Sequence, residues 1–161
     1  QFNMMAGAFT GGQGDYVTLF EPTATEVELA GQGVVLCSIG EQSGEIPYTA
    51  YYAKASYIKE NPETIQGFTN AIYKGQQWVK SASAKEIAET IADFFPDTDV
   101  EILEKVAERY KAIDAWNSDP ILTEDSLSRL QDVIEEAGEL DARAPYEAIV
   151  DTSFAENAVI K

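Results

Sequence analysis

The sequence predicts an α/β fold in which a short sheet is followed by a helical C-terminal segment. Between residues 1 and 58, runs rich in β-branched and aromatic residues alternate with glycine-containing turns, a pattern typical of strands. From 59 to 161, apolar residues recur at helical spacing between capping signals. Strands that alternate with a helix and then give way to a helical tail indicate an α/β domain. We therefore divide the chain into a strand-rich segment, 1–58, and a helical segment, 59–161.

The strand-rich segment contains three predicted strands. The first is the β-prone run 15–20, and Pro22 then suits the first turn of a helix that extends to about residue 30. The run 33–39 is apolar enough to predict a strand that is buried on both faces. Cys37 in this run is interpreted as a buried small hydrophobe, since the chain has no histidine to activate its thiol. The aromatic run 48–53 is the third predicted strand.

The helical segment is marked by helix start and stop signals. Asn61-Pro62 opens a helix, and Ser83 with Glu86 forms a capping box in which each side chain can bond the backbone of the other. Thr98 and Glu101 repeat that pattern. The spacing of the apolar residues predicts helices over 61–80, 83–95, 98–113, 123–138 and 145–150.

The composition excludes several classes of function. The chain has 28 Asp and Glu residues, 11 Lys and Arg residues and no histidine, which gives a formal net charge of −17. Repulsion from phosphate argues against nucleic acid and anionic membranes as partners. The absence of histidine excludes a Ser-His-Asp triad and a His-ligated zinc ion in this chain. An apolar fraction of 45% predicts a packed core, and nothing in the sequence indicates a metal or another cofactor.

The start of the chain is unusual in charge and in composition. Residues 1–53 contain six acids and no base, and Lys54 is the first base. Residues 1–9 are mildly apolar but lack the basic region of a signal peptide, and the first residue is not methionine. We therefore expect that the chain starts inside a larger protein or follows a cleaved leader.

Some motifs that could carry chemistry have a plainer interpretation. Gly11–Gly14 lacks the Lys-Ser/Thr of a phosphate-binding loop and precedes a predicted strand, so we interpret it as a turn. The acidic pairs that could serve in acid/base catalysis but are interpreted as solvated helix faces are Glu26/Glu28 and Glu135/Glu136.

The end of the first predicted strand is the best candidate for a ligand site. Ligands of open α/β sheets bind outside the carboxyl ends of the strands, where the helix that follows Glu21 would present free backbone N–H groups. Glu21 could cap that helix or accept a hydrogen bond from a ligand. Aromatic side chains from the neighbouring strand could form the walls of the site. The predicted ligand-binding residues are Thr18, Phe20, Glu21, Tyr48, Thr49 and Tyr51.

Three segments in order resemble one family. The segment 14–22, GDYVTLFEP, resembles the segment ending in W/F-E-P of nitrate/sulfonate/taurine-type solute-binding proteins, whose relatives bind pyrimidine precursors of thiamine. The segment 44–53, GEIPYTAYYA, resembles the next strand of that family. The segment 56–65, SYIKENPETI, resembles its N-P-E helix start.

The resemblance covers about residues 10–150 and matches the C-terminal half of such receptors. It implies a type II periplasmic-binding-protein fold with two lobes, of which this chain is a fragment. It also implies the substrate-binding component of an ABC importer, located outside the cytoplasm as a periplasmic protein or a lipoprotein at the cell surface. The implied partners are a small solute and, for the intact receptor, an ABC permease. Exposed sheet edges could also drive the fragment to form a homodimer.

The class of solute follows partly from charge. Family analogy offers nitrate, sulfonates, taurine or a pyrimidine-like compound, but residues 1–53 provide no base for an anion. Glu21 beside aromatic rings suits a flat ligand that carries N–H donors. One alternative is a pyrimidine-synthase-like enzyme of the same fold. The family's enzyme chemistry depends on histidine, so we expect no enzyme activity. The other alternative is a helical interaction module without a small ligand.

Overall fold

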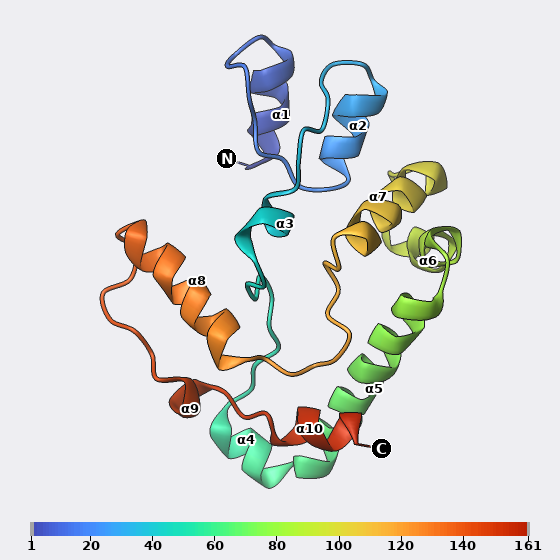
Figure 1. Cartoon of the computed structure of the whole chain (residues 1–161). Helices are drawn as coiled ribbons and strands as arrows, with labels where there is room; N and C mark the ends of the chain where they lie inside the picture. The colour runs from blue at the N-terminus through green and yellow to red at the C-terminus, as the bar shows by residue number, and fades with distance from the viewer. Residues whose placement is uncertain (1, 161) are drawn as a thin grey trace. The chain divides into compact units, whose positions relative to one another are not determined.

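A computed structural model describes residues 2–160, and every regular element in that range is helical (Figure 1). The elements in chain order are α1 (Phe2–Thr10), α2 (Thr23–Leu29), α3 (Ile39–Ser43), α4 (Ala55–Glu60), α5 (Pro62–Ser81), α6 (Ala84–Ile91), the 3₁₀ helix η1 (Ala92–Phe94), α7 (Val100–Ala112), α8 (Glu124–Glu136), α9 (Tyr146–Ile149) and α10 (Ser153–Val159).

The predicted α/β class is wrong for the described part of the chain. None of the runs 15–20, 33–39 and 48–53 is a strand, and residues 2–160 contain no sheet of the type II periplasmic-binding-protein kind. A strand satisfies its backbone only by pairing with another strand, and β-propensity depends strongly on such neighbours. Without partners these runs remain irregular, except where Ile39 begins α3. Cys37 was expected to be buried but is exposed.

The helices after residue 59 are confirmed, with small shifts at their ends. Helix α5 occupies the predicted range 61–80, and Pro62 is its first residue. The capping box of α6 is present, since the Ser83 hydroxyl accepts from the Glu86 N–H and the Glu86 carboxylate accepts from the Ser83 N–H. The second predicted box is wrong, because Asp99 precedes α7 without a side-chain cap. The sequence patterns missed α1, α3, α4 and α10.

The chain divides into two compact units, each built from two stretches. Unit 1 contains the residues up to Glu41 together with Ala82–Ala115, and unit 2 contains Gln42–Ser81 together with the residues from Trp116 onward. Each unit is described separately below.

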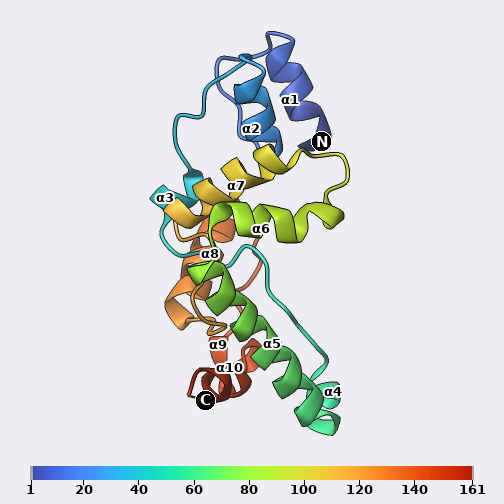
Figure 2. The same cartoon turned by 90° about the vertical axis from the view of Figure 1, so that its right-hand side faces the viewer.

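Unit 1 is centred on the packing of α6 against α7, which both views show side by side (Figures 1 and 2). Its small apolar core includes Ile87, Ala88, Leu103 and Ala107. Helix α2 packs on α7 and on α1. Thr25 of α2 is fully buried, which identifies the contact of α2 with α7 as a tightly packed one.

Unit 2 is organised along the long helix α5, which packs against α10 and contacts α4. Gln66 Nε2 on α5 donates to the Phe154 carbonyl on α10 at 2.9 Å. Gln76 Nε2, further along α5, donates to the carbonyl of Asp119 at 2.9 Å. Two glutamine side chains of α5 thus form hydrogen bonds to residues that come later in the chain, Phe154 and Asp119. Among residues 2–160, no helix combines the length and the apolar composition that crossing a bilayer requires.

Candidate functional site

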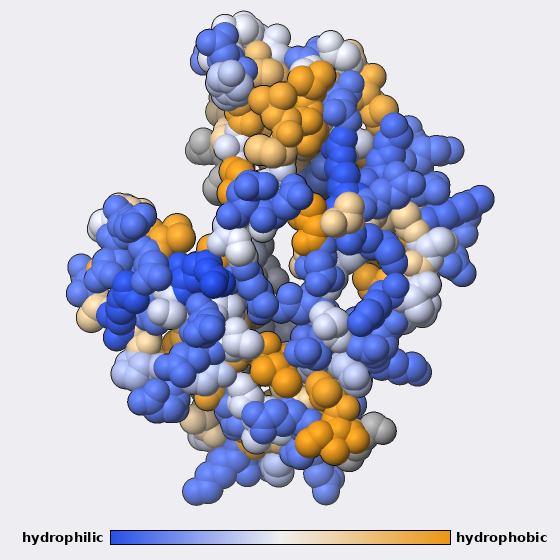
Figure 3. Space-filling view, in the orientation of Figure 1, coloured by the Kyte–Doolittle hydropathy of each residue, from blue (hydrophilic) through white to orange (hydrophobic). Residues whose placement is uncertain are grey.

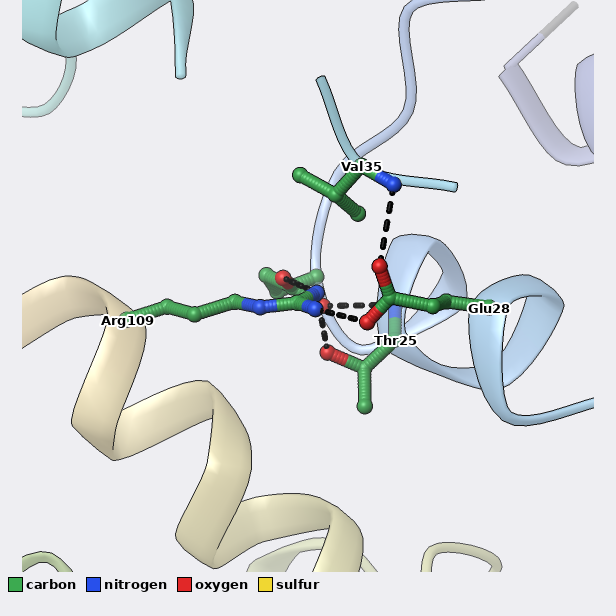
Figure 4. Close-up of polar contacts among 5 residues, drawn as sticks. Thr25, Glu28, Val35 and Arg109 are labelled. Carbon is green, nitrogen blue, oxygen red and sulfur yellow. Dashed lines mark hydrogen bonds and ion pairs between the residues drawn. The ribbon is translucent and has the colours of Figure 1, made fainter. Parts of the chain in front are cut away.

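Glu21, the central residue of the predicted site, takes part in a polar cluster in unit 1. Figure 4 shows this cluster between α2 and α7, with Thr25, Glu28, Val35 and Arg109 labelled. Arg109 Nη1 donates to Glu21 Oε1 at 3.0 Å and to the Thr25 hydroxyl at 2.8 Å. Arg109 Nη2 is ion-paired with Glu28 Oε2. The other Glu28 oxygen accepts from the Val35 N–H at 3.0 Å. We call these five residues the arginine cluster.

Helix geometry explains why these side chains meet. Thr25 and Glu28 are three residues apart on α2, and Glu21 lies one turn before Thr25, so all three share one helix face. Arg109 lies in the last turn of α7, where a cation interacts favourably with the helix dipole. Glu21 Oε2 also accepts from the Thr25 N–H at 3.0 Å, which satisfies a donor in the first turn of α2.

The charges in the arginine cluster stabilise one another. The pKa of Glu28 is lowered, chiefly by the hydrogen bond from the Val35 N–H, while burial opposes this effect and Arg109 reinforces it. Burial disfavours the charge of Arg109, but its bonds to Glu21 and then Glu28 outweigh burial and raise its pKa. One guanidinium therefore serves two carboxylates, and the cluster carries no surplus positive charge.

Glu21 thus has a structural role in the chain. Its side chain is 10% exposed, and each carboxylate oxygen already accepts one hydrogen bond. The N-cap of α2 is Pro22 and not Glu21, although the Glu21 carboxylate accepts from the Thr25 N–H in the first turn of that helix. The role of Glu21 toward a ligand stays a prediction. A carboxylate has about four acceptor positions, so two further hydrogen bonds are chemically available to it.

The remaining predicted ligand residues occupy two irregular segments. Thr18 and Phe20 are exposed in the segment that leads into Glu21 in unit 1. Tyr48, Thr49 and Tyr51 are exposed in the segment before α4 in unit 2. With Glu21, the first segment holds three of the predicted residues in unit 1, and the second segment holds the other three in unit 2.

Tyr51 contacts the aromatic ring of a residue on α5. The Tyr51 and Phe68 rings meet edge to face, with centroids 4.8 Å apart and planes at 80°. Phe68, on α5, is itself 46% exposed, so the pair forms an aromatic surface on unit 2. Such surfaces can stack against planar ligands.

Sequence reasoning missed Arg109 and the role of Glu28. The spacing of Glu21, Thr25 and Glu28 on one helical face was the available signal. Nothing local to Arg109 indicates a partner 88 residues away. Glu26, Glu135 and Glu136 are exposed, as the solvated-face interpretation predicted, and Glu135 is paired with Arg143 on the surface of unit 2.

Comparison with known proteins finds a relative of substantial identity. The chain is 46% identical over 155 residues to a protein of Bacillus subtilis (strain 168) that is named "Putative binding protein YtlA". The match covers 96% of this chain and 46% of the relative, so the chain spans about half the length of the curated relative it matches. No family model matches the chain. No solved structure matches it either.

Proposed function

We propose that the chain belongs to the substrate-binding component of an ABC importer for a small nitrogen- or sulfur-containing solute. The observation that carries this proposal is the 46% identity over nearly the whole chain to a relative that is named a binding protein. The resemblance of segments 14–22, 44–53 and 56–65 to solute-binding receptors agrees with a binding role and narrows it to import.

We further propose that the intact receptor has two lobes and works outside the cytoplasm with a membrane permease. The relative is about twice as long as the matched region, which is the length that a two-lobed receptor needs. In this proposal the chain supplies the C-terminal half, and the rest of the receptor supplies the other side of the ligand site.

The arginine cluster bears on the class of solute. Arg109 pairs with Glu21 at the predicted site segment in unit 1, and its charge is already balanced by Glu21 and Glu28. An anionic solute would therefore gain little from Arg109. Within unit 1, Phe20 exposes aromatic surface next to Glu21 in the sequence, and Glu21 has unused acceptor capacity, so both features support a flat solute that carries N–H donors.

Thermal-shift and calorimetric titration of the whole relative tests the function. The panel is nitrate, taurine, an alkanesulfonate and an aminopyrimidine, and we expect the aminopyrimidine to raise the melting temperature most. A panel that leaves the melting temperature unchanged would contradict import of this solute class. Preferential binding of nitrate or a sulfonate would retain the importer and reject the heterocyclic solute.

A matched pair of substitutions in this chain, placed in the whole receptor, tests the role of Glu21. Glu21→Gln should weaken binding of the aminopyrimidine about tenfold, because it replaces a charge-assisted hydrogen bond with a neutral one. Glu26→Gln is the control, since Glu26 is exposed on α2, the helix that follows Glu21. Equal affinity of the two variants would remove Glu21 from the site.

A further inference from the structure

Four consecutive apolar residues in unit 1 are exposed. They are Val34, Val35, Leu36 and Cys37, which we call the apolar segment, and the first three are 75%, 41% and 69% exposed. Runs of four exposed apolar residues are rare on the surface of a folded protein unless they form a binding surface. Hydrophobic residues also gather over α1 and α2 in the upper part of Figure 3. Unit 1 therefore presents apolar surface beyond what scattered single residues would give.

The backbone of the apolar segment is held in place while its side chains face solvent. The Val35 N–H donates to Glu28, which Arg109 fixes in turn (Figure 4). The preceding residue, Gly33, packs so closely that a β-carbon there would lie 3.0 Å from Phe9 Cε1. A surface that is already ordered loses less entropy on binding than a flexible loop would.

The exposed area of the chain is larger than two separate compact units of these masses would show. The accessible surface is 11628 Å². Two separate compact units with the masses of units 1 and 2 are together expected to expose about 9,500 Å². The excess of at least ~2,000 Å² is the scale of a permanent interface.

The buried residues agree with this excess. Among the described residues, the buried apolar side chains are Ala82, Ile87, Ala88, Leu103, Ala107, Leu127, Ala155 and Ala158. Most of them are alanine, which buries little area, whereas Leu36 and Val34 remain exposed. Large apolar side chains such as Val34 and Leu36 are therefore available to pack against another polypeptide.

We propose that the apolar segment packs against the remainder of a longer polypeptide, the part that corresponds to the relative outside the aligned 155 residues. That part amounts to more than half of the relative, which is enough chain to cover an area of this size. A second copy of the chain is disfavoured, because each copy carries a net charge of −17 and the two would repel. The inference rests on the longer receptor of the proposed function but not on any solute.

The thiol of Cys37 reports directly on this packing. The experiment compares the 161-residue chain with a full-length chimera in which the chain replaces the aligned part of the relative. Both are treated with a maleimide, and labelling of Cys37 is followed by peptide mass spectrometry. We expect fast labelling in the chain and at least tenfold slower labelling in the chimera.

Two variants make the result specific. Lys85→Cys places a thiol at a charged position of unit 1 outside the apolar segment, where the side chain is 66% exposed, and it should label equally fast in both proteins. Leu36→Asp should restore fast labelling of Cys37 in the chimera or prevent the chimera from folding, whereas Lys85→Asp should do neither. Circular dichroism distinguishes these two results of Leu36→Asp, and both support the packing.

Two outcomes would overturn the proposal. Equal labelling of Cys37 in the chain and in the folded chimera would show that the segment stays uncovered. Protection in the 161-residue chain that increases with concentration would identify a second copy as the occupant. The labelling experiment uses no solute. Slow labelling of Cys37 in the chimera can therefore be observed even if none of the solutes binds, so the packing proposal and the proposed function can fail separately.

Discussion

Arg109 Nη1 donates a hydrogen bond to Glu21 Oε1 at 3.0 Å, although 88 residues separate the two in sequence. The first 53 residues contain acids but no base, and this contact supplies one from a distant helix. The charge pattern along the sequence therefore does not describe the charges that surround Glu21 in the folded chain. The arginine cluster leads directly to two tests of stability.

Replacing Arg109 should destabilise unit 1. Arg109→Met leaves two carboxylates and the Thr25 hydroxyl without their shared donor, and we expect the free energy of unfolding to fall by about 1–3 kcal/mol. Urea unfolding followed by circular dichroism measures this change. Arg143→Met removes an exposed ion-pair partner and should cost clearly less. An equal loss for the two variants would show that the arginine cluster contributes no more than a surface pair.

The contribution of Glu28 should depend on pH. Its pKa in the folded chain lies below the ordinary 4.5, so its stabilising effect is present above that value and is lost as the pH falls through the folded pKa. Glu28→Gln should therefore lower the free energy of unfolding at pH 7 and change it much less at pH 3. Urea unfolding at the two pH values gives the comparison, and Glu26→Gln should have a small effect at both. A constant effect of Glu28→Gln would be inconsistent with the shifted pKa.

Two glycine substitutions should have opposite signs. At Gly33 a β-carbon would lie 3.0 Å from Phe9 Cε1 and 3.2 Å from Val27 Cγ1, so Gly33→Ala should destabilise by about 1–3 kcal/mol. At Gly67 in α5 nothing lies within 4 Å of a β-carbon, and Gly67→Ala should stabilise by about 0.5–1 kcal/mol. Melting temperatures of the two variants provide the test. A stabilising Gly33→Ala would mean that the chain before the apolar segment is not closely packed.

The side-chain cap at the start of α6 should contribute more to the free energy of unfolding than the residue at the start of α7, which has no side-chain cap. Ser83→Ala removes the acceptor for the Glu86 N–H and should cost about 1 kcal/mol. Asp99→Ala, at a position without a side-chain cap, should cost less. Urea unfolding of both variants measures the two changes in the free energy of unfolding. A larger decrease for Asp99→Ala than for Ser83→Ala would show that the capping box is not the stronger of the two helix starts.

The helices could be predicted because their signals are local. Ser83 and Glu86 lie within one turn of each other, and Pro62 suits a first helical turn whatever surrounds it. The run Val34–Cys37 carries an equally clear strand pattern, but a strand also needs a partner. In residues 2–160 that partner is missing, so the same side chains are exposed and irregular.

In the candidate site too, the contacts within one helix turn could be predicted from the sequence and the contacts between helices could not. Glu21 could be selected from its place before a proline at a helix start. Its bond to the Thr25 N–H is local and follows from that place. Its ion pair with Arg109 depends on how α7 packs on α2, which no pattern within either helix specifies.

The discontinuous make-up of unit 1 affects the order in which the chain can fold as it is synthesised. The residues up to Glu41 are synthesised before their packing partners in Ala82–Ala115, which follow only after much of unit 2. At ~5–20 residues per second, Arg109 is added ~4–18 s after Glu21. A seven-residue helix such as α2 is unstable alone, so during that interval Glu21 and Glu28 remain hydrated and unpaired. The stretch up to Glu41 is therefore made before the residues that hold it and is fixed only after they are complete.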